Sequence, residues 1–387
     1  YTPTLSVAFN RQRFTEPMWV DSPKSTAGDT EIRVAIGDEH CRHAVEENLQ
    51  EWLKSPVSLL FFSHIRRLRI GEQELCWDSL GPGPVPETEW MALQGSPEQG
   101  FLVARSEAEP FPEASLEEIM QERLLGPDQG TEFPPCKVEI VLGAKGRLYV
   151  VLPTGVETAL PFACNAPFLQ DPARLKIKEP ETSPTNRWLL ERIGKLAASI
   201  MLQWLECSAT SIAERSRAYG FFPDVDRDDG SLEGLCASTA EESFDAAIEG
   251  KAFLLTDTGE LSQAGRSIVI PDRLFDVWPA VQVTAFLDDE CRPAFSHYVS
   301  KSDREKLIHW GVIETINKEN LLQVLLTKHL PRPKSWRCLL NLWAYVAPEL
   351  TVYRSRSGNS KEVRILPVQG KDVLYAASEI VRIGEKK

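Results

Sequence analysis

The feature of the sequence that most constrains its fold is a long amphipathic segment, residues 184–207, that follows several strand-like segments. Ser183 and Pro184 mark its start, because Ser is a preferred N-cap residue and Pro is tolerated at the first helical position. The apolar residues recur at helical spacing and define one face for burial: Trp188, Leu189, Ile193, Leu196, Ile200 and Trp204. Because strands and helices are mixed up to residue 205, we expect an α+β fold built on a mixed sheet.

The segments before this helix show the patterns of strands and of two shorter helices. Strands are predicted where apolar residues alternate or run together, at 30–36, 58–70, 72–79, 101–106 and 160–168. The segments CKVEIVL and GRLYVVLP flank the turn GAKG, which predicts a β-hairpin. Helices are predicted over 42–55, with Pro56 directly after, and over 115–125.

The character of the sequence changes near residue 206. Short amphipathic helices are predicted over 243–250, 303–316, 318–330 and 335–347. Two similar β elements, 253–272 and 363–385, interrupt or follow them, and aligning Gly259 with Gly370 superposes Leu255 on Leu366. We therefore expect an N-terminal segment of residues 1–36, an α+β domain over 37–205 and a mainly helical region over 206–387.

The composition excludes several classes of protein. The chain has a net charge of −13, which argues against a general nucleic-acid coat. It contains no apolar run of the ~20 residues needed to cross a bilayer. The eight cysteines form no CxxC pair and predict reduced thiols in a cytoplasmic protein: Cys41, Cys76, Cys136, Cys164, Cys207, Cys236, Cys291 and Cys338.

No motif specifies a self-contained catalytic or metal centre. The sequence lacks a GxxxxGK[ST] phosphate loop, a GxGxxG fingerprint and a GxSxG elbow. Residues 38–43, DEHCRH, have no second ligand pair of the kind that a zinc site needs. Residues 224–230, DVDRDDG, begin like a calcium loop, but Asp229 and Leu235 replace the required Gly and Glu. We therefore predict no metal site and treat 224–230 as an acidic surface loop.

Two groups of basic residues remain as candidate binding sites. In the strand-like segment 64–70, HIRRLRI, Arg67 and Arg69 are expected on one face, with Arg66 beside them. This group is either a solvated strand face or a patch for phosphate or an acidic partner. The second group, Arg174, Lys176 and Lys178, follows the buried strand at 160–168 in a loop. That loop either binds an anion or packs only against its own domain.

Residues 148–202 resemble the middle segment of sacsin-type proteins, and the resemblance extends over 137–205. These belong to the wider group of gyrase, heat-shock-ninety chaperone, histidine-kinase and MutL ATPases (GHKL). The resemblance weakens over 30–80, where 30–36 resembles the final strand of an ATP-binding lobe, and is faint after 206. The matching residues are a Leu-Pro turn, an Asn-containing strand, a basic loop and a helix start: Leu152, Pro153, Glu157, Thr158, Leu160, Pro161, Asn165, Ala166, Pro167, Phe168, Arg174, Asn186, Arg187, Trp188, Leu189 and Leu190.

The resemblance implies a role for the basic loop. In the family, a basic residue of the middle domain reaches the γ-phosphate of ATP held by a neighbouring lobe and stabilises the charge that develops during phosphoryl transfer. Arg174 is the first candidate for this contact, followed by Lys176 and Lys178, with Asn165 and Gln170 as polar supports. The family's ATP-binding helix and loops are not found in this sequence. The resemblance therefore implies that ATP and Mg²⁺ bind in a lobe before residue 1, and that this chain alone is not catalytic.

The functional expectation is the middle and C-terminal region of a sacsin-like ATPase that relays the ATP state to a partner. Its partners would be its own N-terminal lobe and a second protein or a second copy. The role would be chaperone-like or that of a microbial anti-phage defence subunit. Two alternatives stay open: a non-enzymatic interaction scaffold, and a nucleic-acid-handling subunit that uses Arg66, Arg67 and Arg69.

Overall fold

The computed structural model describes residues 7–10, 13–19, 38–54, 56–62, 65, 67–95, 100–124, 132–171, 176–287, 290, 292–357 and 362–381. The chain separates into two compact units, Tyr1–Lys54 and Ser55–Lys387. This border differs from the expected domain start at residue 37, because the helix that follows residue 38 groups with the N-terminal unit. The two units are described separately below.

The described residues of the N-terminal unit form a hairpin and a helix. Strand β1 (Val7–Asn10) pairs antiparallel with β2 (Arg13–Trp19). Helix α1 (Glu39–Lys54) confirms the helix predicted over 42–55, and it ends two residues before Pro56. The carboxylate of Asp38 accepts a hydrogen bond of 2.8 Å from the Cys41 amide, which satisfies one free N–H of the first turn. The strand predicted over 30–36 lies outside the described residues.

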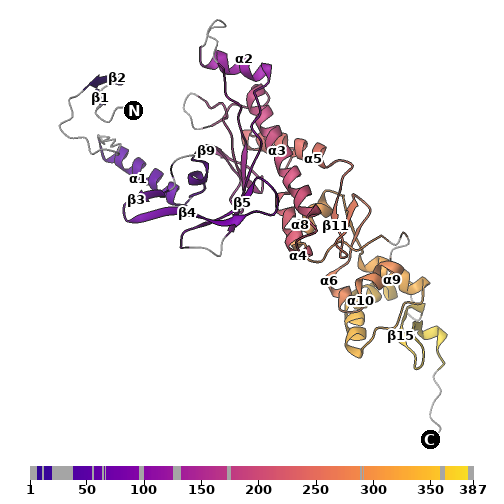
Figure 1. Ribbon diagram of the computed structural model, residues 1–387. Coiled ribbons are helices and arrows are strands. Elements are labelled where there is room, and N and C mark those ends of the chain that lie inside the picture. Colours follow the sequence, from indigo (N-terminus) through magenta and orange to yellow (C-terminus); the bar gives the residue numbers. More distant parts are fainter. Residues whose placement is uncertain are drawn as a thin grey trace. The chain divides into compact units, whose positions relative to one another are not determined.

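An eight-stranded mixed sheet forms the centre of the second unit (Figure 1). Its strand order is β3-β4-β5-β6-β7-β10-β8-β9, and all neighbours are antiparallel except β10 and β8. With the helices that follow, this sheet confirms the α+β class. The strands are β3 (Arg67–Ile70), β4 (Gln73–Pro82), β5 (Thr88–Leu93), β6 (Gly100–Arg105), β7 (Glu139–Leu142), β8 (Arg147–Val150), β9 (Leu152–Glu157) and β10 (Phe162–Asn165).

The predicted hairpin around the GAKG turn is wrong. Strands β7 and β8 form as expected, but they do not pair with each other, because β10 lies between them. Cys164 of β10 is opposite Ile140 of β7 on one side and Leu148 of β8 on the other. All four residues of β10 are buried, including the polar Asn165, and a strand that is buried on both faces is most stable in the interior of a sheet.

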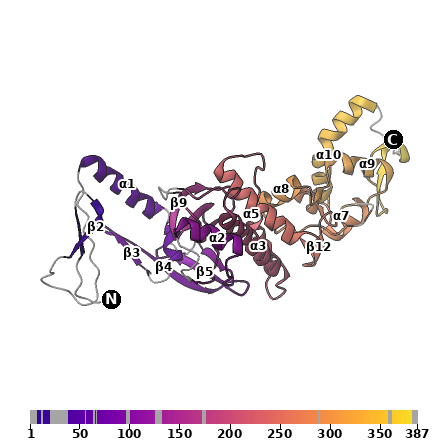
Figure 2. The same ribbon diagram turned by 90° about the horizontal axis from the view of Figure 1, so that it is seen from above.

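Both faces of the central part of the sheet are covered, and β6 shows this residue by residue. Leu102 and Ala104 belong to the large core that includes helices α3 (Pro184–Glu206) and α5 (Leu232–Ile248). Phe101 and Val103 point to the opposite face, where a smaller cluster includes the 3-10 helix η1 (Pro56–Phe61). The strand predicted over 58–70 is therefore wrong in its first half, since those apolar residues cap the second face. Helices α3 and α5 lie side by side in both ribbon views (Figures 1 and 2).

The predicted start of α3 is confirmed. Ser183 is the N-cap, its hydroxyl accepts a hydrogen bond from the Asn186 amide, and Pro184 is the first helical residue. Helix α2 (Glu113–Glu122) confirms the helix predicted over 115–125.

Residues 206–387 are mainly helical, as predicted, and carry two small hairpins. The hairpin of β11 (Ala252–Leu255) and β12 (Leu261–Gln263) and that of β15 (Arg364–Pro367) and β16 (Leu374–Ala376) lie in the two predicted β elements. Each loop contains a glycine with positive φ, Gly259 at 85° and Gly370 at 74°. The other elements are α4 (Ile212–Arg215), η2 (Ser216–Phe221), β13 (Ile268–Val269), α6 (Asp272–Phe275), α7 (Ala280–Leu287), α8 (Lys301–His309), β14 (Glu314–Thr315), α9 (Lys318–Thr327), α10 (Trp336–Ser357) and η4 (Ala377–Glu379).

Two separate hydrophobic cores organise these elements, and neither ends at the expected boundary of 205/206. The first core extends from Val85 to Ile313, because α3 packs on α5 and on the β11–β12 hairpin. The second core spans Ile268 to Leu374 and joins α6, α7, α9 and α10 with the second hairpin.

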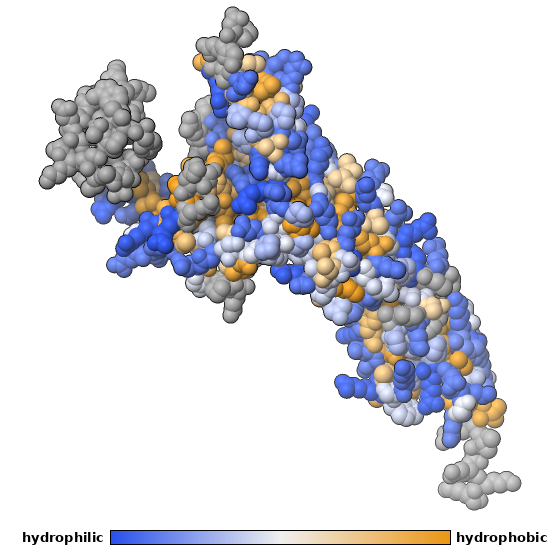
Figure 3. All heavy atoms as spheres, viewed as in Figure 1, coloured by the Kyte–Doolittle hydropathy of each residue, from blue (hydrophilic) through white to orange (hydrophobic). Residues whose placement is uncertain are grey.

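Hydrophilic residues cover much of the face drawn in Figure 3, with apolar residues gathered in smaller groups between them. In the part of the chain that the structure describes, no helix is both long enough and apolar enough to span a membrane.

Candidate functional site in the loop between β10 and α3

The loop that carries the predicted basic residues folds back on itself after β10. The Lys178 amide donates to the Leu169 carbonyl, and the Asp171 amide donates to the Lys176 carbonyl, both at 2.9 Å. Between these bonds, Gln170 and Ile177 form an antiparallel bridge. The two arms of the loop, 169–171 and 176–178, thus form a short ladder. Residues 172–175, which include Arg174, lie outside the described residues.

Asn186, in the first turn of α3, holds both arms of this loop. Its Oδ1 accepts a hydrogen bond from the Leu169 amide at 2.8 Å. Its Nδ2 donates to the carbonyls of Leu169 and Lys178, each at 2.9 Å. The side chain is fully buried, so these three bonds form in a low-dielectric setting where an unpaired amide would be costly. The base of the loop is therefore fixed to the start of α3.

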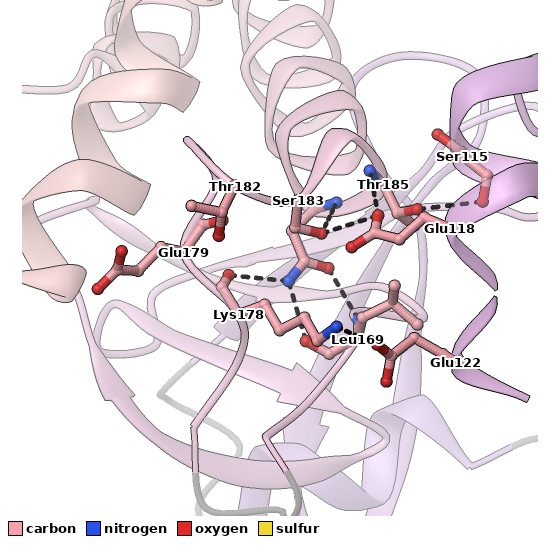
Figure 4. Close-up of polar contacts among 10 residues, drawn as sticks. Ser115, Glu118, Glu122, Leu169, Lys178, Glu179, Thr182, Ser183 and Thr185 are labelled. Carbon is pink, nitrogen blue, oxygen red and sulfur yellow. Dashed lines mark hydrogen bonds and ion pairs between the residues drawn. The ribbon is translucent and has the colours of Figure 1, made fainter.

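Helix α2 braces the same junction with a carboxylate (Figure 4). Glu118 Oε2 accepts hydrogen bonds from the Ser183 hydroxyl at 3.0 Å and from the Thr185 amide at 2.9 Å. The Thr185 hydroxyl donates to the Ser115 carbonyl at 3.3 Å. A carboxylate at a helix N-terminus satisfies free amides and interacts favourably with the helix dipole. Ser183 and Thr185 are fully buried, so α2, the loop and α3 meet in one closed hydrogen-bonded junction.

The two described lysines of the loop both face carboxylates of their own unit. Lys178 forms an ion pair with Glu122 on the last turn of α2. The Lys176 Nζ lies 3.6 Å from Glu233 Oε1 at the start of α5, and the Lys176 side chain is 55 % exposed. Lys178 is thus committed to α2, and Lys176 is the more accessible of these two cations.

The two predicted polar supports differ in their surroundings. The Asn165 Oδ1 accepts a bond from the Val151 amide at 2.8 Å, and its Nδ2 donates to Glu139 at 2.7 Å. Because both ends of this amide are used within the sheet, we assign Asn165 a structural role and do not retain it as a cofactor contact. Gln170 is half-buried on the loop itself, in the ladder with Ile177.

The predicted basic strand is an edge of the sheet. Arg67 and Arg69 of β3 share the exposed face, as predicted, while Leu68 and Ile70 are half-buried. The Arg67 Nε lies 2.9 Å from Glu74 on the neighbouring strand β4, and the Arg69 Nε donates to the Gly71 carbonyl at 3.1 Å. Arg66 lies outside the described residues. The described members of this group therefore make local contacts and do not form a cluster of free cations.

The two metal-like motifs behave as surface segments. His43 lies 3.3 Å from Glu47, one turn further along α1. In the acidic loop, Asp226 accepts from the Asp228 amide and Asp229 from the Ser231 amide, which are local turn bonds. Among the described residues there is no group of three or more His, Cys, Asp or Glu that could hold a metal ion.

Sequence reasoning missed the contribution of α2. Glu118 and Glu122 are four residues apart, which predicts one helix face, but nothing in the sequence indicates that this face meets Ser183 and Lys178.

Comparison of the chain with protein-family models, with curated proteins and with solved structures found no match. The functional conclusion therefore depends on the junction itself.

Proposed function

We propose that this chain is the middle and C-terminal region of a sacsin-like ATPase of the GHKL group, and that the loop 169–178 contacts the phosphates of ATP bound by a separate N-terminal lobe. The observation that carries the proposal is the double attachment of the loop, to α3 through Asn186 and to α2 through Lys178. The resemblance over residues 148–202 and the α+β fold with a mixed sheet are in keeping with it.

A rigid base is what such a contact requires. A cation stabilises developing charge best when it is already in place, so that no reorganisation is needed during phosphoryl transfer. Arg174 is our first candidate for the contact, because its planar guanidinium is permanently charged and fits phosphate oxygens. Lys176 is second, and Lys178 acts in attaching the loop, since its charge is paired with Glu122.

The same attachment provides a route for relaying the ATP state. Asn186 joins the loop to α3, and α3 packs along α5 within the first core. A displacement of the loop on ATP binding would therefore move the start of α3 and pass to the helical region. That region would contact a protein partner, in a chaperone-like complex or in a defence subunit directed against foreign DNA.

The test uses the full-length protein with its N-terminal lobe and measures ATP turnover at saturating ATP. Arg174→Ala is expected to lower turnover by roughly 10²-fold or more while ATP affinity stays the same, because the contact is made mainly in the transition state. Asn186→Ala is expected to lower turnover to a smaller extent, because the loop loses its anchor. Lys195→Ala, on the exposed side of α3, is the matched control and should have no effect. Unchanged turnover with Arg174→Ala would remove the proposed role.

One observation favours a second candidate, the non-enzymatic interaction scaffold. Both described lysines of the loop are paired with carboxylates of their own unit, as expected for a loop that packs only against its own domain. The scaffold predicts that the full-length protein folds and binds its partner but neither binds nor hydrolyses ATP.

A further inference from the structure

A second basic surface lies in the C-terminal part of the chain and plays no part in the proposed ATP contact. We call it the basic-aromatic face and define it by Arg332, Lys334, Trp336, Arg337 and Leu340. Residues 328–337 contain four Lys and Arg and no Asp or Glu, in a chain with a net charge of −13. Trp336 is 64 % exposed and Leu340, one helical turn later, is 57 % exposed.

The backbone beneath this face is held firmly. Pro331 and Pro333 restrict φ on both sides of Arg332. The Trp278 indole donates to the Pro331 carbonyl at 2.9 Å, and the Arg332 amide donates to the Asp372 carbonyl at 2.7 Å. The Ser335 hydroxyl accepts from the Cys338 amide at 3.1 Å at the start of α10. Because this backbone is already ordered, binding costs little backbone entropy, which favours a recognition surface.

The positive charges of the face have no carboxylate partners among the described residues. Arg332, Lys334 and Arg337 take part in no ion pair there, and the one side-chain bond of Arg332 is a contact of 3.5 Å with the Val368 carbonyl. Other arginines of the same region are paired: Arg304 with Asp272 at 2.8 Å, Arg292 with Glu314 at 3.1 Å and Arg364 with Glu379 at 2.8 Å. The three cations of the face are therefore held in no ion pair among the described residues, although one carboxylate, that of Asp276, lines the groove beside them.

An apolar groove lies beside these charges. It has a volume of about 330 Å³, near the lower limit of ligand pockets. Its apolar lining includes Phe275, Trp278, Pro279 and Pro331, and its polar lining consists of Asp276, Gln282, Arg332 and Lys334. The groove belongs to the second core, so its floor is packed and preformed. Its size suits one large apolar side chain.

We propose that the basic-aromatic face binds an acidic peptide segment of a partner protein, with one large apolar side chain of that segment in the groove. Exposed Trp and Arg are the residues that most often dominate protein interfaces, and acidic residues of the partner would pair with Lys334 and Arg337. A nucleic acid fits less well, because the aliphatic Leu340 and the apolar lining of the groove offer no contact to phosphates.

The experiment selects peptides from a phage library of random dodecapeptides on the whole chain. Enriched peptides are then measured by fluorescence anisotropy at low and at high salt, with oligothymidylate as the nucleic-acid probe. We expect enrichment in Asp and Glu around one large apolar residue, and binding that weakens with salt. The double variant Lys334→Glu, Arg337→Glu should weaken binding about tenfold or more, and Trp336→Ala several-fold.

Lys251→Glu, at an exposed basic position before β11, is the matched control and should bind like the wild type. Thermal unfolding of each variant should be unchanged, because every substituted side chain is exposed. The proposal is overturned if no peptides are enriched, if they lack acidic residues, if the double variant binds them equally well, or if oligothymidylate binds more tightly than any selected peptide.

Discussion

At the residue scale, the partly buried carboxylate of Asp245 on α5 has too little positive charge around it to balance its own. Asp245 Oδ2 lies 2.5 Å from the guanidinium of Arg227, which also binds the fully buried Glu241 at 2.8 Å and stacks over Trp310. The pKa of Asp245 is raised to about 6: burial is the largest cause, the hydrogen bond from Arg227 opposes the rise, and the neighbouring Glu241 adds to it. Arg227 is shared between Glu241 and Asp245, so the negative charge of Asp245 is only partly compensated. The Asp245 Oδ1 atom is buried without a hydrogen-bond partner.

This imbalance predicts a pH dependence of stability. Since the folded pKa of Asp245 lies above the unfolded value of 3.8, the folded state binds the extra proton. The stability that this proton contributes is complete below pH ~4 and is lost as the pH rises through about 6. The free energy of unfolding in urea should fall by about 1 kcal/mol more for the wild type than for Asp245→Asn when the pH rises from ~5 to ~7. Asp228→Asn, in the exposed acidic loop, is the control; a constant difference between wild type and Asp245→Asn would contradict the prediction.

At the scale of elements, the contact of α3 with α5 depends on a glycine. A Cβ atom at Gly194 of α3 would lie 2.0 Å from the Ala240 carbonyl oxygen of α5, so the two backbones approach as closely as glycine permits. Ala240 is itself buried, and its small side chain suits this narrow contact.

We predict that Gly194→Ala destabilises the protein, although alanine is the better helix former by about 1 kcal/mol. The helices must separate to admit the methyl group, which should cost about 1–3 kcal/mol in chemical unfolding. Gly230→Ala serves as the control, because a Cβ there meets nothing within 4 Å. A Gly194→Ala protein as stable as the wild type would show that the helices can move apart freely.

At the scale of the second unit, two cores share a narrow boundary. Neighbouring residues face opposite cores: Val269 and Phe295 belong to the first, and Ile268 and Ala294 to the second. Strand β13 and residues 294–295, which pair with each other, therefore form the wall between them. Because this wall separates the two cores, a side chain can be removed from one core without opening a cavity in the other.

We predict that cavities in the two cores have local effects. Leu189→Ala in the first core and Leu342→Ala in the second each remove a fully buried side chain and should cost about 2–5 kcal/mol. Hydrogen exchange measured by mass spectrometry should show faster exchange mainly within the substituted core. Equal loss of protection in both cores from either substitution would mean that they unfold as one.

Local chemistry made much of this structure predictable. Ser183 and Pro184 specify where α3 begins, because capping depends only on neighbouring residues. The exposed alternation of Arg67 and Arg69 follows from the period of a strand. The basic loop was also visible as a run of charges after a buried strand. These features depend on short-range geometry that the sequence contains in full.

The tertiary structure alone decided the rest. Placing β10 between β7 and β8 required a pairing that no turn signal encodes. The sequence predicts Lys178 as a cation available for a ligand. In the structure it attaches the loop to α2, because Glu122, 56 residues earlier in the chain, is its partner. Periodicity and capping residues determine elements one at a time, whereas strand order and charge partners are set by the burial of all the elements together.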